Sequence, residues 1–213
     1  MDKVQVKNSQ NVFFTVQGKS TGITLSNLDL KAISRSSAPP KNTDGSDIGL
    51  SSWVTLSNTK VLNGITCTGP HGVSVGSLGK ASGSTDSVTN DLVGSAVMIK
   101  STKAAGIKVY RGGSSHGSSI VRNVTWDGVN VQNSDYAFTI EPWYDGTAAY
   151  CKANGASSTI SGIYVKNCKG TTSKKCAPTT GEVFCPVKGL ACDVHVKWVE
   201  CPSHWSSRKG PLQ

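Results

Sequence analysis

Short strand-like phrases that end in Asn or Gly recur along this chain and constrain its fold most strongly. Residues 23–27 read ITLSN and residues 54–58 read VTLSN, and related alternating phrases stand at 64–67, 121–126, 129–133 and 162–167. Each phrase predicts a short strand closed by a turn residue. The two most similar phrases start roughly thirty residues apart, which is too long for a hairpin and typical of one coil of a parallel solenoid.

In a parallel solenoid every strand stacks on its equivalent in the next coil. Apolar side chains then form internal ladders, and a turn Asn can hydrogen-bond along a column. The chain contains 23 Gly and only 2 Met, a balance that favours short strands and tight turns over long helices. The sequence therefore predicts an all-β parallel solenoid, with an antiparallel β-sandwich as the alternative that also contains many short strands.

The length of 213 residues fits one domain. We expect a single domain over residues 1–202 and an irregular tail over residues 203–213. Loops are predicted at 35–41, which includes a Ser-Ser-Ala-Pro-Pro run, and at 79–87.

Charge and cysteine content bear on the partner and the compartment. With 22 Lys plus Arg against 13 Asp plus Glu, the chain has a formal charge of +9 and can attract nucleic acid, anionic membrane or acidic polysaccharide.

Seven cysteines indicate disulfides and an oxidising compartment. The first residues contain no export signal, so either the protein is intracellular, which fits its cysteines poorly, or its true beginning is missing, as we expect. No stretch has the length of a membrane span. Asn123, in Asn-Val-Thr, is the predicted glycosylation site.

Three motifs contain residues that could carry chemistry. Asp44 lies in NTDGSD at 42–47, His71 in GPHG at 69–72, and Lys108 in AAGIK at 104–108. Taken singly they are compatible with an Asx-turn, a loop histidine and a solvated charge. The functional alternatives are a general base for Asp44 and a catalytic histidine for His71.

In this order, the motifs resemble glycoside hydrolase family 28, the polygalacturonases, and are closest to fungal exo-acting members. The resemblance is carried by NTDGSDIG at 42–49, GITCTGPHGVSVGSLGK at 64–80, STKAAGIKVY at 101–110, the run from Asn123 to Tyr144, and CPVKGLACDV at 185–194. It implies a right-handed parallel β-helix, a pectin-lyase-like solenoid. It also implies inverting hydrolysis of α-1,4-galacturonosyl bonds of pectin, secretion, and no cofactor or metal. The implied partner is an acidic polysaccharide, with no nucleic acid or membrane partner, and the protein is expected to be a monomer.

The resemblance assigns roles to single residues of this chain. Asp44 matches a carboxylate that positions the attacking water, and His71 matches a histidine that assists the acid by hydrogen bonding. Lys108 would pair with a substrate carboxylate, and Tyr144 would line a sugar subsite. Gly106 stands where many endo-acting members have Arg, which favours exo action.

The resemblance also shows a gap. Family members have a pair of Asp residues, usually followed by Cys, between the motifs that contain Asp44 and His71, and this pair supplies the general acid and a second base. In this chain no Asp lies between Asp47 and Asp86. The missing segment has about the length of one coil, so the neighbouring coils could restack. Its loss leaves Cys67 without the family partner, whereas Cys185 and Cys192 match a family disulfide.

Three functions of other classes remain as alternatives. The absent Asp pair makes a non-catalytic galacturonan-binding protein the main one. Residues 72–76 fit the G-x-S-x-G pattern of esterases, without a following helix. Cys185, Cys192, His195, Cys201 and His204 could ligate zinc in a nucleic-acid-binding module, although their spacing matches no standard finger.

Overall fold

The computed structural model describes residues 1–9, 11–32, 46–49, 51–57, 60–63, 72–177, 179–185 and 192–197. Asp44, Cys67, His71 and Cys201 lie outside them, as do the predicted loop at 35–41 and the tail at 203–213.

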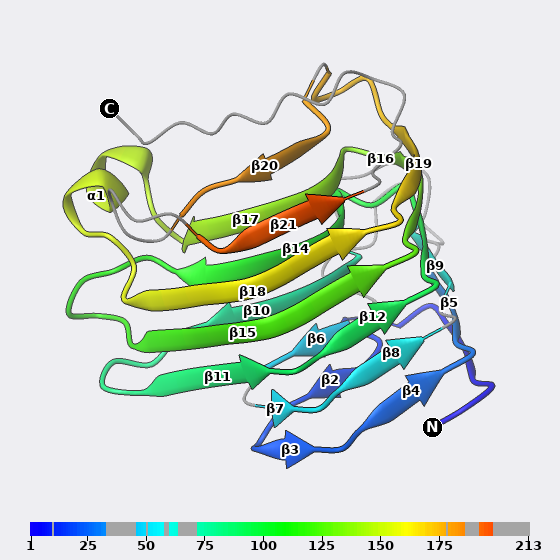
Figure 1. The fold of residues 1–213 in the computed structure, drawn as a ribbon, viewed down its shortest axis with the longest axis horizontal. Helices are drawn as coiled ribbons and strands as arrows, with labels where there is room; N and C mark the ends of the chain where they lie inside the picture. The colour runs from blue at the N-terminus through cyan, green and yellow to red at the C-terminus, as the bar shows by residue number, and fades with distance from the viewer. Residues whose placement is uncertain are drawn as a thin grey trace.

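The described strands form three parallel sheets (Figure 1). Sheet B contains β1 (Gln5–Lys7), β5 (Asp29–Ala32), β9 (Lys60–Asn63), β13 (Val97–Ile99), β16 (Asn130–Ser134) and β19 (Lys169–Thr172). Sheet C contains β2 (Thr15–Val16), β6 (Ser46–Ile48), β10 (Val73–Leu78), β14 (Lys103–Tyr110), β17 (Tyr136–Tyr144) and β20 (Gly181–Val183). Sheet A contains β3 (Ser20–Thr21), β4 (Thr24–Ser26), β7 (Ser51–Ser52), β8 (Thr55–Ser57), β11 (Thr85–Thr89), β12 (Leu92–Gly94), β15 (Ser118–Asp127), β18 (Ser158–Lys166) and β21 (Val194–Lys197).

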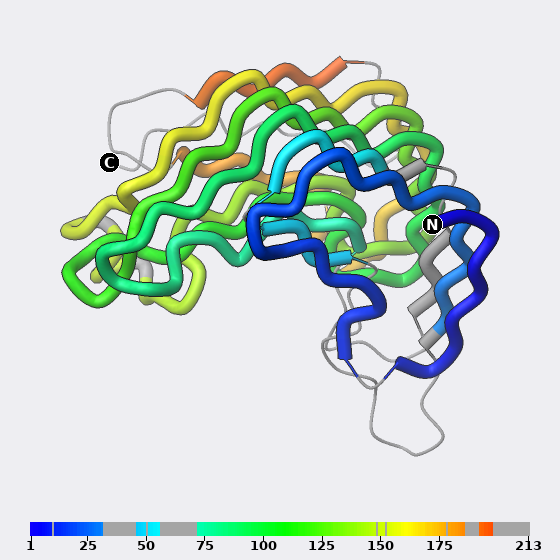
Figure 2. Tube along the Cα trace, turned by 90° about the horizontal axis from the view of Figure 1, so that it is seen from below, coloured from blue at the N-terminus to red at the C-terminus, as the bar shows by residue number. Residues whose placement is uncertain are grey.

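Each coil passes from sheet C through sheet A to sheet B and then returns to sheet C. The coil of β10, β11, β12 and β13 shows this order, and each of its strands pairs in parallel with the equivalent strand of the next coil. Figure 2 shows successive coils running side by side with their bends aligned. The fold is a right-handed parallel β-helix, as predicted, and the β-sandwich alternative is wrong.

Registered ladders of apolar side chains fill the interior. On sheet C, Ile48, Val75, Ile107 and Ile140 are register partners, and all four are buried. Burying one such side chain contributes roughly 1.5–3 kcal/mol, so a ladder that continues through several coils supplies much of the stability. Because side chains alternate along a strand, the residues between these positions face outward.

Columns of left-handed residues produce the bends within the coils. Asn90 and Asn123 have φ values of 61° and 54°, a conformation that Asn tolerates better than most residues. The Asn123 Nδ2 donates a hydrogen bond of 3.1 Å to the Asn90 Oδ1, 33 residues earlier in the chain. In a second column, the Asn167 Nδ2 donates to the Asp127 Oδ1 at 2.7 Å. The prediction that turn Asn residues bond along columns is confirmed.

Two local features are the segment at 79–87, which differs from the prediction, and a short helix. The predicted loop at 79–87 is wrong at its end, because Thr85, Asp86 and Ser87 belong to β11 and pair with β15. The short helix α1 (Ala148–Ala153) begins after Thr147, whose hydroxyl accepts the Tyr150 N–H. In the part of the chain that the structure describes, no helix is long and apolar enough to cross a membrane.

Strand β6 stacks directly on β10 in sheet C. Ser46 pairs with Val73, Asp47 with Ser74 and Ile48 with Val75. The alternation of inward and outward side chains therefore continues across the position where the sequence lacks the Asp pair. A segment of about one coil can be absent because each coil contacts only its neighbours and the repeat is restored on restacking.

One buried carboxyl group makes the fold sensitive to pH. Asp91 is only 2% exposed, its Oδ1 accepts the Val54 N–H at 2.9 Å, and burial raises its pKa to about 6. An unfolded Asp titrates near pKa ~3.9, so the folded state holds this proton more tightly. Ionising Asp91 therefore destabilises the native state progressively as the pH rises through about 6.

We expect Asp91→Asn to raise the free energy of unfolding by about 1–3 kcal/mol at pH 7.5 and by almost nothing at pH 4. The amide oxygen can still accept the Val54 N–H, and the ionisation penalty is removed. Urea denaturation at both pH values measures the difference, with Asp145→Asn, at an exposed position, as the matched control. An equal gain at pH 4 would show that packing, and not ionisation, is responsible.

Candidate functional site

The outward face of sheet C carries a continuous row of polar positions. Asp47, Ser74, Gly106, Thr139 and Glu182 are successive register partners on β6, β10, β14, β17 and β20. They alternate with the buried apolar ladder, so their side-chain directions point out of the coil. This row thus has a carboxylate at each end and small or hydroxyl-bearing residues between them, of which Ser74 and Thr139 are buried.

The next outward row contains the charged centre of the face. Lys108 of β14 is the register partner of Glu141 of β17. Glu141 forms an ion pair with Lys103, at the beginning of β14, and accepts a 3.3 Å hydrogen bond from the Thr139 hydroxyl. Lys103 and Lys108 are each only 4% exposed. Both ammonium groups are therefore held in a largely dehydrated place, where ionic interactions are stronger than in water, whereas the Glu141 side chain is 36% exposed.

An aromatic cluster lies at the end of the same two strands. Tyr110 is the register partner of Tyr144, and their rings meet edge to face with centroids 5.1 Å apart. The Lys108 Nζ lies 5.7 Å from the Tyr144 ring centroid, within the range of a cation–π contact. His116, from the turn after β14, stacks on Tyr110 at 5.0 Å. The structure therefore brings together the two residues, Lys108 and Tyr144, that the sequence marked as substrate-binding.

A second cation lies beside this cluster. The Arg111 guanidinium lies 5.0 Å from the ring centroid of Tyr150, in α1, and donates to the Asp145 carbonyl oxygen. In Figure 1, α1 lies at the edge of the fold where β14 and β17 end. This edge thus combines a cation with aromatic rings.

Sequence reasoning missed several residues of this face. Tyr110 could have been found, because it is two residues after Lys108 and alternation places both outward. Lys103 gave no such signal, since it is an odd number of residues from Lys108 and reaches the same face only through its long side chain. Glu141 could be recognised only through its register with Lys108.

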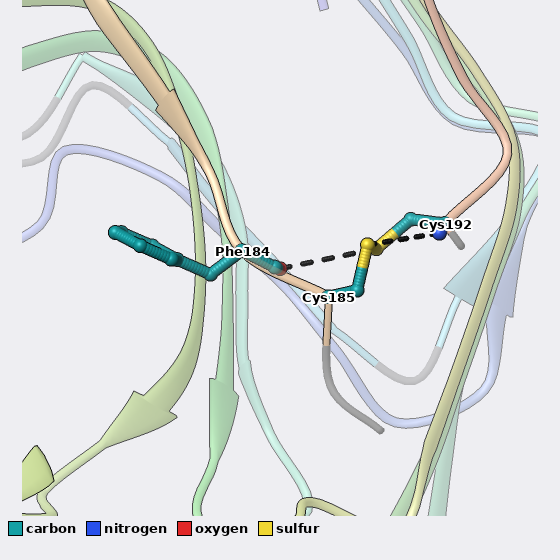
Figure 3. Close-up of a disulfide and its surroundings, with 3 residues drawn as sticks. All are labelled: Phe184, Cys185 and Cys192. Carbon is teal, nitrogen blue, oxygen red and sulfur yellow. Dashed lines mark hydrogen bonds between the residues drawn. A yellow bond between two sulfur atoms is a disulfide. The ribbon is translucent and has the colours of Figure 1, made fainter. Parts of the chain in front are cut away.

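The remaining predicted residues lie elsewhere. Cys185 and Cys192 form a disulfide with Cα atoms 5.4 Å apart, next to Phe184 (Figure 3). This bond uses two of the sulfurs considered as zinc ligands, and His195 stacks on Tyr164 and pairs with Asp193 at 2.7 Å. Within the described ranges no group of three or more His, Cys, Asp or Glu residues could hold a metal.

Two further sequence patterns have a clear structural setting. Ser74, in the G-x-S-x-G pattern, is buried as the second residue of β10 and not at a strand-to-helix turn, so it cannot act as an esterase nucleophile. Asn123 is exposed on sheet A, where its amide bonds Asn90, and its glycosylation stays a prediction.

Comparison with known proteins identifies the class to which this fold and face belong. A model of glycosyl hydrolases family 28 matches residues 1–199, and the chain belongs to this family. A probable endo-xylogalacturonan hydrolase A of Emericella nidulans is 46% identical over 209 residues, covering 90% of this chain and 52% of that protein. Endo-xylogalacturonan hydrolase A of Aspergillus tubingensis is 44% identical over 216 residues, covering 92% and 52%.

A solved structure agrees with these relatives. The crystal structure of endo-xylogalacturonan hydrolase from Aspergillus tubingensis superposes with a TM-score of 0.80 at 40% identity, covering 97% of this chain and 59% of that chain. The chain spans about half the length of the curated relatives it matches. These relatives are named as endo-acting, so the expected exo-type detail is not confirmed.

The disulfide closes a short loop, which sets its contribution to stability. With a sequence separation of 7, the loop-closure model gives about 2–3 kcal/mol. We expect the double variant Cys185→Ser, Cys192→Ser to lose that amount of unfolding free energy and therefore to unfold at a lower urea concentration. Cys176→Ser is the single-thiol control. An unchanged midpoint would show that the disulfide does not constrain the unfolded chain.

Proposed function

We propose that this chain binds the galacturonan backbone of pectin on the outward face of sheet C and hydrolyses it far more slowly than a complete family member. The observation that carries the proposal is the placement of Lys108, a buried ammonium over the Tyr144 ring and in register with Glu141. A galacturonate unit has one carboxylate for the lysine and a sugar ring for the tyrosine. The formal charge of +9 favours capture of such a polyanion.

We propose Asp44 and His71 as what this chain retains of the catalytic machinery. Asp44 is two residues before Ser46, and His71 is two residues before Val73, and Ser46 and Val73 are register partners. In inverting hydrolysis one carboxylic acid protonates the leaving oxygen while another carboxylate activates water. Asp44 would position the water, and His71 would assist an acid.

This chain has no residue that could act as the general acid at the position where the family has it. No Asp or Glu occurs between Asp47 and Asp86, and β6 stacks directly on β10. General acid–base catalysis contributes about 10²–10⁴-fold. We therefore propose binding as the function of this chain and hydrolysis as the chemistry of its lineage.

The substrate class can be narrowed from the relatives. Those described above are named endo-xylogalacturonan hydrolases, which supports a xylose-bearing galacturonan and an internal binding position on the polymer. We propose xylogalacturonan as the preferred ligand, in place of the plain polymer cut from its end. Secretion and action as a monomer complete the proposal.

Binding and turnover measured on one sample test this function. We expect calorimetry to show binding of xylogalacturonan oligomers, while reducing-sugar release stays at least about 100-fold below that of the complete Aspergillus tubingensis enzyme. Turnover equal to that enzyme would contradict the missing acid. Absence of binding to both xylogalacturonan and polygalacturonate would reject the proposed function.

A variant pair tests the proposed binding residue. Lys108→Met should weaken oligogalacturonate binding by about tenfold or more, because a charge-assisted contact is lost. Lys7→Met removes the same charge from an exposed position of β1 in sheet B and should leave affinity nearly unchanged. Equal losses in both variants would mean that net charge, and not the sheet C face, determines binding.

A further inference from the structure

Lys103 occupies an unusual place for a lysine. It begins β14, its side chain is 5% exposed, and its ammonium pairs with Glu141 of the next coil, 38 residues later. Burying an ammonium group is costly unless a counterion and hydrogen bonds compensate. The Glu141 carboxylate, by contrast, is 36% exposed, so one end of this ion pair reaches solvent.

Gly106 provides the path by which Lys103 reaches the outward face. A Cβ built on Gly106 would point outward, because its neighbours Ala105 and Ile107 belong to the buried ladder. That Cβ would lie 3.4 Å from the Lys103 Cδ, 2.9 Å from the Thr139 Oγ1 and 2.7 Å from the Thr139 carbonyl oxygen. The aliphatic stem of Lys103 therefore crosses the face above the glycine, in space that a larger residue would fill.

The result is a fixed order of groups across two strands. Glu141 is bonded by Lys103 and by the Thr139 hydroxyl, and it stands in register with Lys108, whose ammonium lies over Tyr144. A carboxylate held by these donors remains an acceptor, and its exposed part can accept hydrogen bonds from a ligand. A uronic acid offers hydroxyl donors on the same ring that bears its carboxylate.

We propose that Glu141 binds sugar hydroxyls of the uronate unit whose carboxylate contacts Lys108, and that Lys103 is the positioning residue that holds Glu141 for this contact. This assignment rests on the proposed function, since it concerns the same face of sheet C. It makes the face recognise two parts of one sugar: Lys108 recognises the acid group and Glu141 recognises the hydroxyls.

The two roles can be separated with two ligands of equal length. A galacturonate oligomer has both carboxylates and hydroxyls, and its methyl-esterified form keeps the hydroxyls but is uncharged. Glu141→Gln should weaken binding of both ligands by a similar factor, about tenfold, because a charged acceptor is lost in each case. Lys108→Met should weaken binding of the acidic ligand alone.

Lys103 variants test the positioning role. Lys103→Met should give the same two-ligand pattern as Glu141→Gln, and the double variant should be no weaker than the stronger single variant, because the two residues act as one unit. Lys103→Arg, which keeps the charge, should restore most of the affinity for both ligands. Thermal unfolding of each variant separates loss of fold from loss of binding.

Several outcomes would overturn the assignment. Tighter binding of the acidic oligomer by Glu141→Gln would show that Glu141 merely repels the ligand. Loss of the acidic ligand alone in Lys103→Met would make Lys103 a direct carboxylate contact. If Lys108→Met loses affinity while Glu141→Gln does not, this inference fails and the proposed function stands. If the native chain binds neither ligand, both fail.

Discussion

The stacking of each coil in parallel register on its neighbour is the constraint on which the rest of this structure depends. Register places Ile48, Val75, Ile107 and Ile140 in one buried ladder. The positions that alternate with this ladder must then form outward rows, because a shift of one residue would reverse every side chain of a strand. The functional face is therefore a consequence of the core, and Lys108 meets Glu141 because β14 and β17 are in register.

The same constraint explains how the chain can lack a family segment and keep its fold. Strand β6 meets β10 with the same alternation of apolar and polar positions that joins β10 to β14. Neighbouring coils offer nearly equivalent pairing edges. When about one coil is absent, the strands on either side of it can therefore pair with each other, and no edge is left unpaired. The fold and the acid groups are thus separable in this architecture, because the coils on either side of an absent coil can still pair with each other.

The sequence predicted the features that depend on local pattern. Repeated ITLSN-like phrases predicted the coils, and Asn27, Asn133 and Asn167, which end such phrases, mark bends as expected. It failed where the structure depends on the reach of a long side chain or on pairing between strands far apart in the sequence. The end of the predicted loop at 79–87 forms β11 because β15 supplies a pairing partner, which no local propensity encodes. Lys103 reaches the site across a glycine, and strand periodicity gives no sign of this.

The central claim is that the outward face of sheet C, at the end of β14 and β17, binds the uronate. A crystal structure with a short galacturonate oligomer tests this most directly. We expect a carboxylate within hydrogen-bond distance of the Lys108 Nζ and a sugar ring against Tyr144. An oligomer bound instead on sheet A or sheet B, with the Lys108 and Tyr144 contacts unchanged, would contradict the account.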